Sequence, residues 1–492
     1  MAAAATLGYH PYAEDAGIYL SSLNYTLNPA LYAASRPFLL AYAHLTLFPE
    51  LLALIVRALH LPVAWVLLLL HLGLLWLLII SVRALAVRCF TQPPVQWAAV
   101  AITALALGTP VAGTALCIAD PYLTPRSFAT PLCLLLFTAV LDRRPRRALL
   151  LLAATLCLHP LMGLYGAFFA LVLWTTSTRR IHGTLRVCLA AVLIALLAAL
   201  SQQHVTESPA YIHAALTRTY FYLQEWQWYE LIGVFAPLIL LLLIYRADRV
   251  RQTSDAANCT ALSAAAAACG LTVLFISALL IHPAGHSHLL ARLQPVRTFH
   301  TIYVVLFLLF AGKCAERVRQ RLPGRYFAAV MAVFLLLLAG SMTLVQRHIF
   351  SGSAHLEMPY RAPQNAWEQA FVWARDNTPQ DALFALDATY ITQPGEDGQH
   401  FRALSQRSAL PDYSKDGGGA AIFPQLATQW QSGMTLSTGL SQLSDRERIA
   451  RLAPAGVSWI VLQQRLQTGD AVTHFDCPYR NTVVMVCRLP RS

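Results

Sequence analysis

Ten apolar segments follow one another between residues 62 and 346, and they constrain the fold more than any other feature of the chain. They lie at about 62–82, 96–116, 127–141, 148–158, 161–175, 187–200, 231–245, 259–282, 299–312 and 326–346. A helix needs about 20 mainly apolar residues to cross a bilayer, so we expect the shorter segments to be tilted spans, half-helices or parts of longer spans. The chain is 57% hydrophobic and only 12% charged, against roughly 25% charged residues in soluble domains. Residues 62–346 are therefore predicted to form an α-helical polytopic membrane domain of about ten spans.

Clusters of basic residues between the apolar segments predict which loops face the cytoplasm. The clusters are Arg83 and Arg88; Arg143, Arg144, Arg146 and Arg147; Arg179, Arg180 and Arg186; Arg246, Arg249 and Arg251; and Lys313, Arg317, Arg319, Arg321 and Arg325. Cytoplasmic loops are enriched in Lys and Arg, and placing every cluster inside lets the spans alternate without contradiction. One helix over 148–175 would place Arg179 and Arg180 outside, so we expect a hairpin that turns at His159-Pro160. The net charge of +12 thus reflects topology and lipid contact, and indicates no nucleic-acid partner.

This alternation of cytoplasmic and outer loops places the unusual segments on the outer face. They are the region before residue 62, the loop around Asp120, the His159-Pro160 turn, 201–230, 283–298 and the tail after 347. The tract 37–61 has Pro49 and Glu50 at its middle. As a single membrane crossing it would break the alternation of cytoplasmic and outer loops. It predicts an interfacial or re-entrant pair of short helices, which with the preceding acidic loop makes residues 1–61 an outer-face region. If the tract crosses once instead, Glu14 and Asp15 lie in the cytoplasm.

The tail from residue 351 to 492 is predicted to be a small soluble α/β domain outside the cytoplasm. NAWEQAFVWARDNTP has a helical period that ends before Pro379, while DALFALD, VSWIVLQ and TVVMVCRLP resemble strands, the last entering a hairpin at Tyr479-Arg480-Asn481. Gly417, Gly418 and Gly419 are interpreted as a flexible loop. Cys477 and Cys487 flank PYRNTVVMV and could form a disulfide in an oxidising compartment. The other eight cysteines are expected to be small core residues.

An acidic pair, Glu14 and Asp15 in HPYAEDAGIYL, is the best candidate for chemistry. A carboxylate beside a bilayer is costly to desolvate, so one kept there usually binds a cation, pairs with a base or transfers a proton. The alternative is a solvated loop.

Basic residues and imidazoles at the outer ends of the helices are a second candidate. Arg126 follows Asp120 in a tight loop, and Arg292 and Arg297 lie in LARLQPVRTFH, which ends at His300. Such side chains suit a phosphate, which Arg can hold bidentately, although they could also snorkel to headgroups or cap helices. In IHPAGHSH the Pro and Gly break any helix that would fix the histidine spacing, so no metal site is predicted there, while a divalent metal cofactor stays open. The aromatic stretch 201–230 fits either an interfacial belt or a stacking surface for a sugar or a polyprenyl chain.

The pieces together resemble the GT-C integral-membrane glycosyltransferases, the superfamily of protein O-mannosyltransferases, aminoarabinose transferases and oligosaccharyltransferase catalytic subunits, and more closely a bacterial branch of them. The matching stretches are HPYAEDAGIYL, NPALY, DPYLTPRSFATP, LHPLMGLYG, LARLQPVRTFH and HFRALSQRSALPDYSK. In the superfamily a transmembrane helix normally precedes the acidic loop, whereas this chain starts almost inside that loop. Either the start is truncated, or residues 37–61 tether the loop.

The resemblance implies transfer of a sugar from a polyprenyl phosphate or diphosphate donor to an unknown acceptor at the outer face of a bacterial inner membrane. Glu14 or Asp15 would be the catalytic base. Arg126, Arg292, Arg297 and His159 would bind the donor phosphate, with Asp120 and His300 as additional site residues. The tail would cover the site or shape acceptor choice. The alternatives are a transporter or flippase of lipid-linked substrates, or a non-catalytic membrane protein with an outer binding domain.

Overall fold

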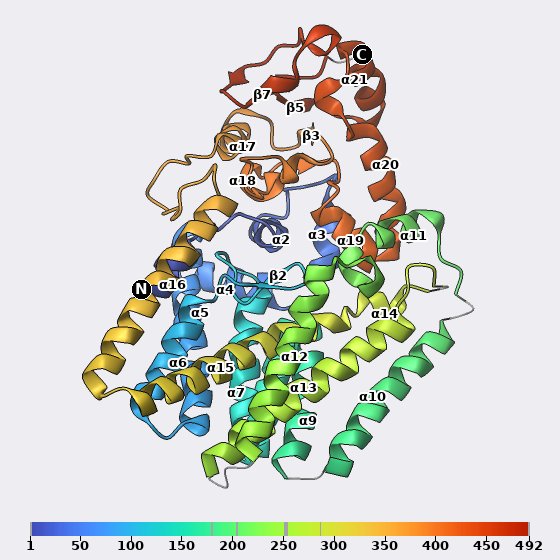
Figure 1. The fold of residues 1–492 in the computed structure, drawn as a ribbon. Coiled ribbons are helices and arrows are strands. Elements are labelled where there is room, and N and C mark those ends of the chain that lie inside the picture. Colours follow the sequence, from blue (N-terminus) through green and yellow to red (C-terminus); the bar gives the residue numbers. More distant parts are fainter. Residues whose placement is uncertain (1, 179–180, 203–204, 250–253, 286, 491–492) are drawn as a thin grey trace. The chain divides into compact units, whose positions relative to one another are not determined.

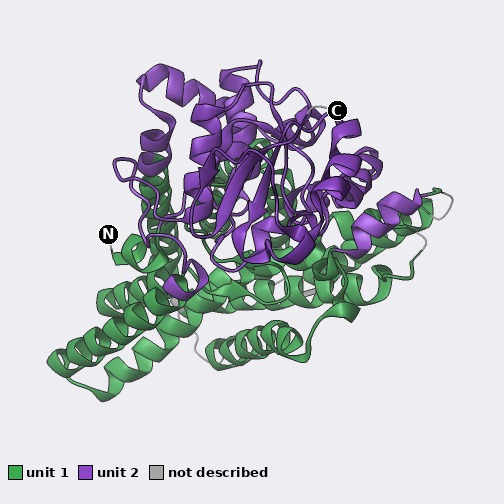
Figure 2. Cartoon of the chain, turned by 90° about the horizontal axis from the view of Figure 1, so that it is seen from above, with its two compact units in different colours: residues 1–8, 70–206, 218–346 green, residues 9–69, 207–217, 347–492 purple. Residues whose placement is uncertain are grey.

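The computed structural model describes residues 2–178, 181–202, 205–249, 254–285 and 287–490, and they are mostly helical, with a small mixed sheet near the C-terminus (Figure 1). The chain divides into two compact units (Figure 2). Unit 1 comprises residues 1–8, 70–206 and 218–346. Unit 2 comprises residues 9–69, 207–217 and 347–492, so it combines the tail with most of the N-terminal region.

Unit 1 contains the long apolar helices. Its elements are α1 (Ala2–Leu7), most of α5 (Val63–Cys89), α6 (Pro93–Leu105), β1 (Pro110–Val111), β2 (Leu116–Cys117), α7 (Pro125–Leu141), α8 (Pro145–Leu158), α9 (Pro160–Ser177), α10 (Ile181–Ser201), η1 (Thr219–Phe221), η2 (Leu223–Glu225), α12 (Trp228–Arg249), α13 (Ser254–Leu280), α14 (Leu289–Arg292), η3 (Pro295–Thr298), α15 (Phe299–Arg321) and most of α16 (Gly324–Ile349).

Each of the ten predicted spans corresponds to one of these helices, but within the described residues only seven helical segments are long and apolar enough to cross a membrane. The seven are α5, α9, α10, α12, α13, α16 and the segment Leu289–Arg321, which contains α14, η3 and α15. Helices α6, α7 and α8 have 13, 17 and 14 residues. Seven such segments indicate a membrane protein.

The span predicted at 96–116 is wrong beyond Leu105. The helix ends there, and the antiparallel pair β1–β2 follows. Proline lacks the N–H that a helix needs and disfavours the helical conformation in the residue before it, so Pro110 excludes a continuous helix. The turn uses Gly113, whose φ of +66° is in the left-handed region that glycine adopts without strain.

Two helices, and not one, cover residues 148–175, as predicted. Helix α9 begins with Pro160 at its first turn, and its N-cap is His159, whose Nδ1 accepts a hydrogen bond from the Met162 N–H at 3.4 Å. Both α8 and α9 pack against α7. The neighbouring Arg179 and Arg180, and Arg251 of the next basic cluster, lie outside the described residues.

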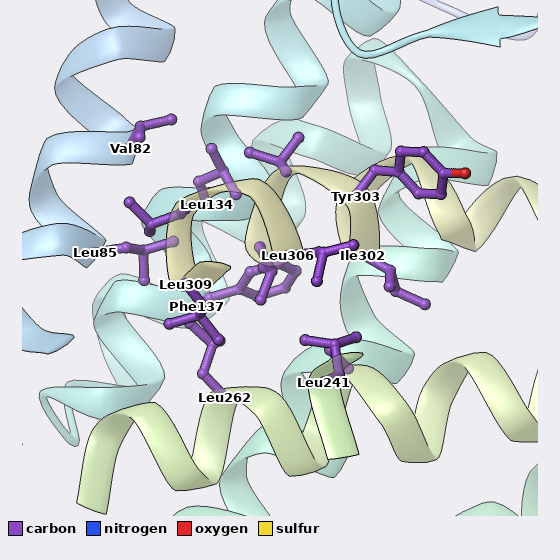
Figure 3. Packing of buried hydrophobic residues seen from close by; sticks show 14 of the residues in the cluster. Val82, Leu85, Leu134, Phe137, Leu241, Leu262, Ile302, Tyr303, Leu306 and Leu309 are labelled. Atoms are coloured by element: carbon purple, nitrogen blue, oxygen red, sulfur yellow. The ribbon is translucent and has the colours of Figure 1, made fainter. Parts of the chain in front are cut away.

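The core of unit 1 is built around α13 and α15 (Figure 3). The apolar window of the Leu289–Arg321 segment is 78% buried and that of α13 is 67% buried, against 6% for α10 and 0% for α16. Small residues allow this packing: an added Cβ at Gly312 would lie 2.0 Å from the Phe90 ring, and one at Gly270 would lie 2.4 Å from Leu238. The central helices therefore pack as in a protein interior, and the peripheral ones expose apolar side chains.

Unit 2 is an α/β structure around a five-stranded sheet in the order β4-β3-β5-β7-β6. Strand β3 is parallel to β4 and β5, while β7 is antiparallel to β5 and β6. The strands are β3 (Leu383–Ala385), β4 (Ser408–Ala409), β5 (Trp459–Gln463), β6 (Tyr479–Arg480) and β7 (Val484–Arg488). The helices are α2 (Ala16–Leu27), α3 (Arg36–Ala43), α4 (Phe48–Leu59), α11 (Pro209–Leu216), α17 (Ala366–Asn377), η4 (Tyr390–Thr392), α18 (Phe401–Ser405), α19 (Lys415–Ile422), η5 (Pro424–Leu426), α20 (Ala427–Ser437), η6 (Leu440–Gln442), α21 (Asp445–Leu452), η7 (Ala453–Ala455), η8 (Gln464–Leu466) and η9 (Gly469–Ala471).

The structure confirms the helix, the three strands and the hairpin predicted in the tail, which are α17, β3, β5 and the pair β6–β7. It also joins Cys477 and Cys487 in a disulfide. The tract 37–61 is a pair of short helices, as predicted: α3 and α4 meet at an angle of 93°, and α4 packs against α2.

The interpretation of Gly417, Gly418 and Gly419 as a flexible loop is wrong, because all three lie in α19. Tertiary packing overrides the low helix propensity of glycine here. An added Cβ at Gly419 would lie 3.2 Å from the ring of Tyr42, so the absence of side chains lets the tyrosine approach the helix.

Candidate functional site

The acidic pair of the N-terminal segment lies against a lysine of the tail, within unit 2. The Lys415 ammonium donates to Oε2 of Glu14 and, at 2.9 Å, to Oδ1 of Asp15. The Lys415 side chain is only 11% exposed, whereas those of Glu14 and Asp15 are 44% and 33% exposed. We call these three residues the acid–lysine cluster. It joins two of the stretches that carry the family resemblance, HPYAEDAGIYL and HFRALSQRSALPDYSK.

The backbone around the acidic pair departs from ordinary local preferences. Glu14 has a φ of +53°, a conformation that is strained for a residue with a side chain. Asp15 is at the N-cap of α2 but makes no side-chain capping bond, although Asp is among the best N-cap residues. Gly398 leaves room for Glu14, because an added Cβ would lie 2.9 Å from the Glu14 carboxylate. Both carboxylates are therefore directed to Lys415 at the expense of local stability.

A chain of buried polar contacts fixes Lys415. Its backbone N–H donates to Oδ1 of Asp412 at 2.6 Å, and the Asp412 N–H donates to Oδ2 of Asp416 at 2.9 Å. Asp416 in turn accepts two hydrogen bonds from the Arg402 guanidinium, at 2.9 and 2.7 Å. His400 packs against the first turn of α2, where an added Cβ at Gly17 would lie 2.0 Å from it.

Burial and charge shift the proton equilibria of this cluster. Burial alone would lower the pKa of Lys415, but Asp15 and Glu14 outweigh it, so that pKa is raised. Burial raises the pKa of Asp412 to about 7, and burial, followed by the charge of Arg402, lowers the pKa of His400 to about 3. Near neutral pH Lys415 is therefore an ammonium, and the neighbouring His400 is a neutral imidazole.

Sequence reasoning missed Lys415 as a site residue, although a signal was present. Only two of the 36 Lys+Arg residues of the chain are lysines, Lys313 and Lys415. Both form buried or half-buried ion pairs with carboxylates, Lys313 with Asp248 at 2.7 Å. Lysine and arginine differ in geometry and hydration, so the rare lysine was a signal that could have drawn attention to Lys415.

Buried acids hold the segment before the acidic pair. Tyr9 and Ala13 form single backbone bridges to Leu356 and Gln399, and Nδ1 of His10 lies 3.5 Å from the Glu357 carboxylate. Burial raises the pKa of Glu357 to about 8. Burial and the nearby Glu357 raise the pKa of Glu368 to about 8 as well.

These raised pKa values predict a pH dependence of unit 2. The folded chain retains protons on Glu357 and Glu368 that the unfolded chain loses above about pH 4.5, so stability is lost as the pH rises from there to about 8. The double variant Glu357→Gln/Glu368→Gln should avoid this loss, and at pH 9 it should be more stable than the wild type by at least about 2 kcal/mol, or roughly 4 °C or more in unfolding temperature. Thermal unfolding of the detergent-solubilised protein, followed by tryptophan fluorescence at pH 5 and pH 9, measures this difference. Glu50→Gln, at an exposed position of α4, is the control, and parallel pH profiles of wild type and double variant would contradict the prediction.

In unit 1 the structure brings five of the predicted residues together from separate segments. Arg126, in the first turn of α7, donates to Oδ2 of Asp120 at 2.6 Å, and both side chains are buried. His300, in the first turn of α15, is fully buried, contacts the Ile118 carbonyl oxygen through Nε2 at 3.0 Å, and interacts electrostatically with Arg126, His159 and Arg297. We call Asp120, Arg126, His159, Arg297 and His300 the arginine–histidine cluster.

Arg297 is the residue of this cluster best suited to receive an anion. Its Nε donates to the Thr114 carbonyl oxygen at 3.3 Å, and its guanidinium lies over the Tyr220 ring, 5.1 Å from the centroid. Among the described residues no carboxylate pairs with Arg297, whereas Arg126 is already paired with Asp120. Stacking on Tyr220 leaves the planar fork of donors available for bidentate binding of a phosphate.

The remaining predicted residues fall into different environments. Arg292 is a half-buried residue of α14, and His282 precedes α14 in the loop after α13. His286 lies outside the described residues. No group of three or more His, Cys, Asp or Glu in the described part of the chain is arranged to hold a metal ion.

The aromatic stretch 201–230 is divided between the two units. Residues 207–217 belong to unit 2, and residues 201–206 and 218–230 belong to unit 1. Four of its aromatic side chains are buried, those of Tyr211, Phe221, Tyr222 and Trp226. Trp228 and Tyr229, at the start of α12, are 72% and 59% exposed, as in an interfacial belt.

Comparisons with known proteins add no family: no protein-family model matches the chain, and a search of curated proteins found no match.

Proposed function

We propose that this protein is a membrane glycosyltransferase of the GT-C type, which moves a sugar from a polyprenyl phosphate or diphosphate donor to an acceptor at the outer face of a bacterial inner membrane. The observation that carries the proposal is the arginine–histidine cluster. Two arginines and two histidines that lie up to 174 residues apart in sequence come together in unit 1 among helices long enough to span a bilayer. A guanidinium without a carboxylate partner, such as that of Arg297, suits the phosphate of a lipid-linked donor.

The proposed reaction also needs a base, and within unit 2 the acid–lysine cluster offers two candidates, Glu14 and Asp15. In the proposed step a nucleophilic O–H or N–H of the acceptor gives its proton to Glu14 or Asp15. The acceptor atom then forms a bond to the anomeric carbon as the bond from that carbon to the donor phosphate oxygen breaks. The leaving phosphate gains the negative charge, which cationic hydrogen-bond donors stabilise. A transporter or flippase would share the need for phosphate binding but would not need the acidic pair for chemistry.

Arg297→Met tests the donor side. A hydrogen bond to a charged group contributes about 1.5–3 kcal/mol, so the variant should bind a short-chain polyprenyl phosphate at least about 10-fold more weakly. Binding of the radiolabelled phosphate to the purified full-length protein in lipid nanodiscs measures this change.

The matched control is Arg83→Met. Arg83 belongs to unit 1 and also stacks on an aromatic ring, that of Trp97 at 4.7 Å, but it lies in α5 within a predicted cytoplasmic cluster. Its replacement should leave binding unchanged. Equal affinities of wild type and Arg297→Met would exclude the donor site. Binding that depends on Arg297 without any sugar transfer would favour the transporter.

A further inference from the structure

Lys415 contacts both candidate bases and is more firmly held than either of them. Its ammonium bridges two carboxylates that come from adjacent residues, and its own backbone is tied through Asp412 and Asp416 to Arg402. A surface lysine that pairs by chance is usually exposed and contributes little. The side chain of this lysine is only 11% exposed, and it contacts an aspartate that makes no capping bond to its own helix.

The site uses its two cations in different ways. Arg402 presents a planar fork and holds one carboxylate, that of Asp416, through two hydrogen bonds. Lys415 presents a compact charge with three rotatable donors, which can reach two carboxylates that point in different directions. The compact ammonium of Lys415 therefore fits the bridging position between Glu14 and Asp15.

We infer that Lys415 is a positioning residue for the proposed base: it holds Glu14 and Asp15 side by side, and its charge offsets the repulsion between the two carboxylates. This inference rests on the proposed function for its catalytic meaning, while the ionisation of the pair can be measured without any activity. Two neighbouring carboxylates repel each other, and without a cation between them one takes up a proton at higher pH. A protonated carboxyl group cannot act as a base. Two further titratable groups interact electrostatically with the cluster: Glu396 with Glu14, and His400 with Asp15 and Lys415.

The test compares two neutral variants, Lys415→Met and Lys415→Gln, with the charged variant Lys415→Arg and the wild type. Carbodiimides react with protonated carboxyl groups, so the purified full-length protein in detergent is treated with a water-soluble carbodiimide and glycine ethyl ester between about pH 3.5 and pH 7, which includes the ordinary range of carboxyl titration. Mass spectrometry then measures labelling of Glu14 and Asp15. In the neutral variants the midpoint of labelling should move up by about one pH unit or more, while Lys415→Arg should label like the wild type because it retains the charge.

Labelling of Asp445 is the control for folding, because its carboxylate binds Arg448 in the same unit at 2.7 Å, away from the acidic pair in sequence. It should not change in any variant. Wild-type labelling of Glu14 and Asp15 in both neutral variants would overturn the inference.

In a transfer assay, the acid limb of the pH–rate profile should shift upward with the labelling midpoint in the neutral variants. If the proposed function is wrong, the wild type shows no transfer, but the neutral variants still show the labelling shift. If this inference is wrong, the wild type transfers the sugar and the neutral variants show no labelling shift.

Discussion

Asp15→Asn and Glu14→Gln, made separately, should abolish sugar transfer in at least one case and leave expression intact. A positioned general base contributes about 10²–10⁴-fold to a rate, and the amide cannot take the proton of the acceptor. Each amide keeps an oxygen that can accept from the Lys415 ammonium, so the contacts seen at Oε2 of Glu14 and Oδ1 of Asp15 can persist. The loss should therefore be one of chemistry rather than of folding.

The measurement is the incorporation of radiolabel from a set of polyprenyl-phosphate-linked sugars into the membrane fraction of cells that express each variant. Asp470→Asn is the matched control, because Asp470 is an exposed aspartate of the same unit, in η9. It should transfer at the wild-type rate. Normal transfer by both Asp15→Asn and Glu14→Gln would contradict the assignment of the acidic pair as the base. The response of each variant also identifies which of the two carboxylates takes the proton.

The parts of the fold that were predictable from the sequence depend on local pattern. Apolar runs predicted the long helices, and β-branched and apolar runs predicted β3, β5 and β7, since both signals come from residues within a few positions of one another. The break at His159-Pro160 was predictable because proline restricts the residue before it. The end of α6 was missed because the apolar composition continues past Leu105, while the structure changes at Pro110.

The parts that were not predictable depend on contacts between distant residues. Gly417, Gly418 and Gly419 are helical because the Tyr42 ring packs against α19, a contact between residues more than 370 positions apart. The acid–lysine cluster joins residues 400 and 401 positions apart. Charge and local spacing selected Glu14, Asp15, Arg126 and Arg297 as candidates one at a time. Their partners Lys415 and Tyr220 could be assigned only from the fold.

Arg402→Met should give the largest loss of stability in unit 2. Arg402 and Asp416 are 3% and 6% exposed, and the guanidinium also donates to the carbonyl oxygens of Ala409 and Leu410. Removing one partner of a buried ion pair leaves an uncompensated charge and costs about 3–5 kcal/mol. The unfolding temperature should therefore fall by roughly 10 °C or more. Because Asp416 helps to fix Asp412 and thereby Lys415, the acid–lysine cluster should be disturbed as well.

Thermal unfolding of the detergent-solubilised variants, followed by tryptophan fluorescence, tests this expectation. The matched control is Arg375→Met, which removes an arginine from an exposed pair of the same unit: the Arg375 and Asp376 side chains are 39% and 55% exposed. Exposed pairs contribute about 0–1 kcal/mol, so its unfolding temperature should stay close to that of the wild type. The double variant Arg402→Met/Asp416→Asn removes both charges and keeps an acceptor for the Asp412 N–H, and it should recover part of the loss. A double variant no more stable than Arg402→Met would show that the arginine stabilises the unit through its packing and its bonds to Ala409 and Leu410, and that the charge of Asp416 contributes nothing.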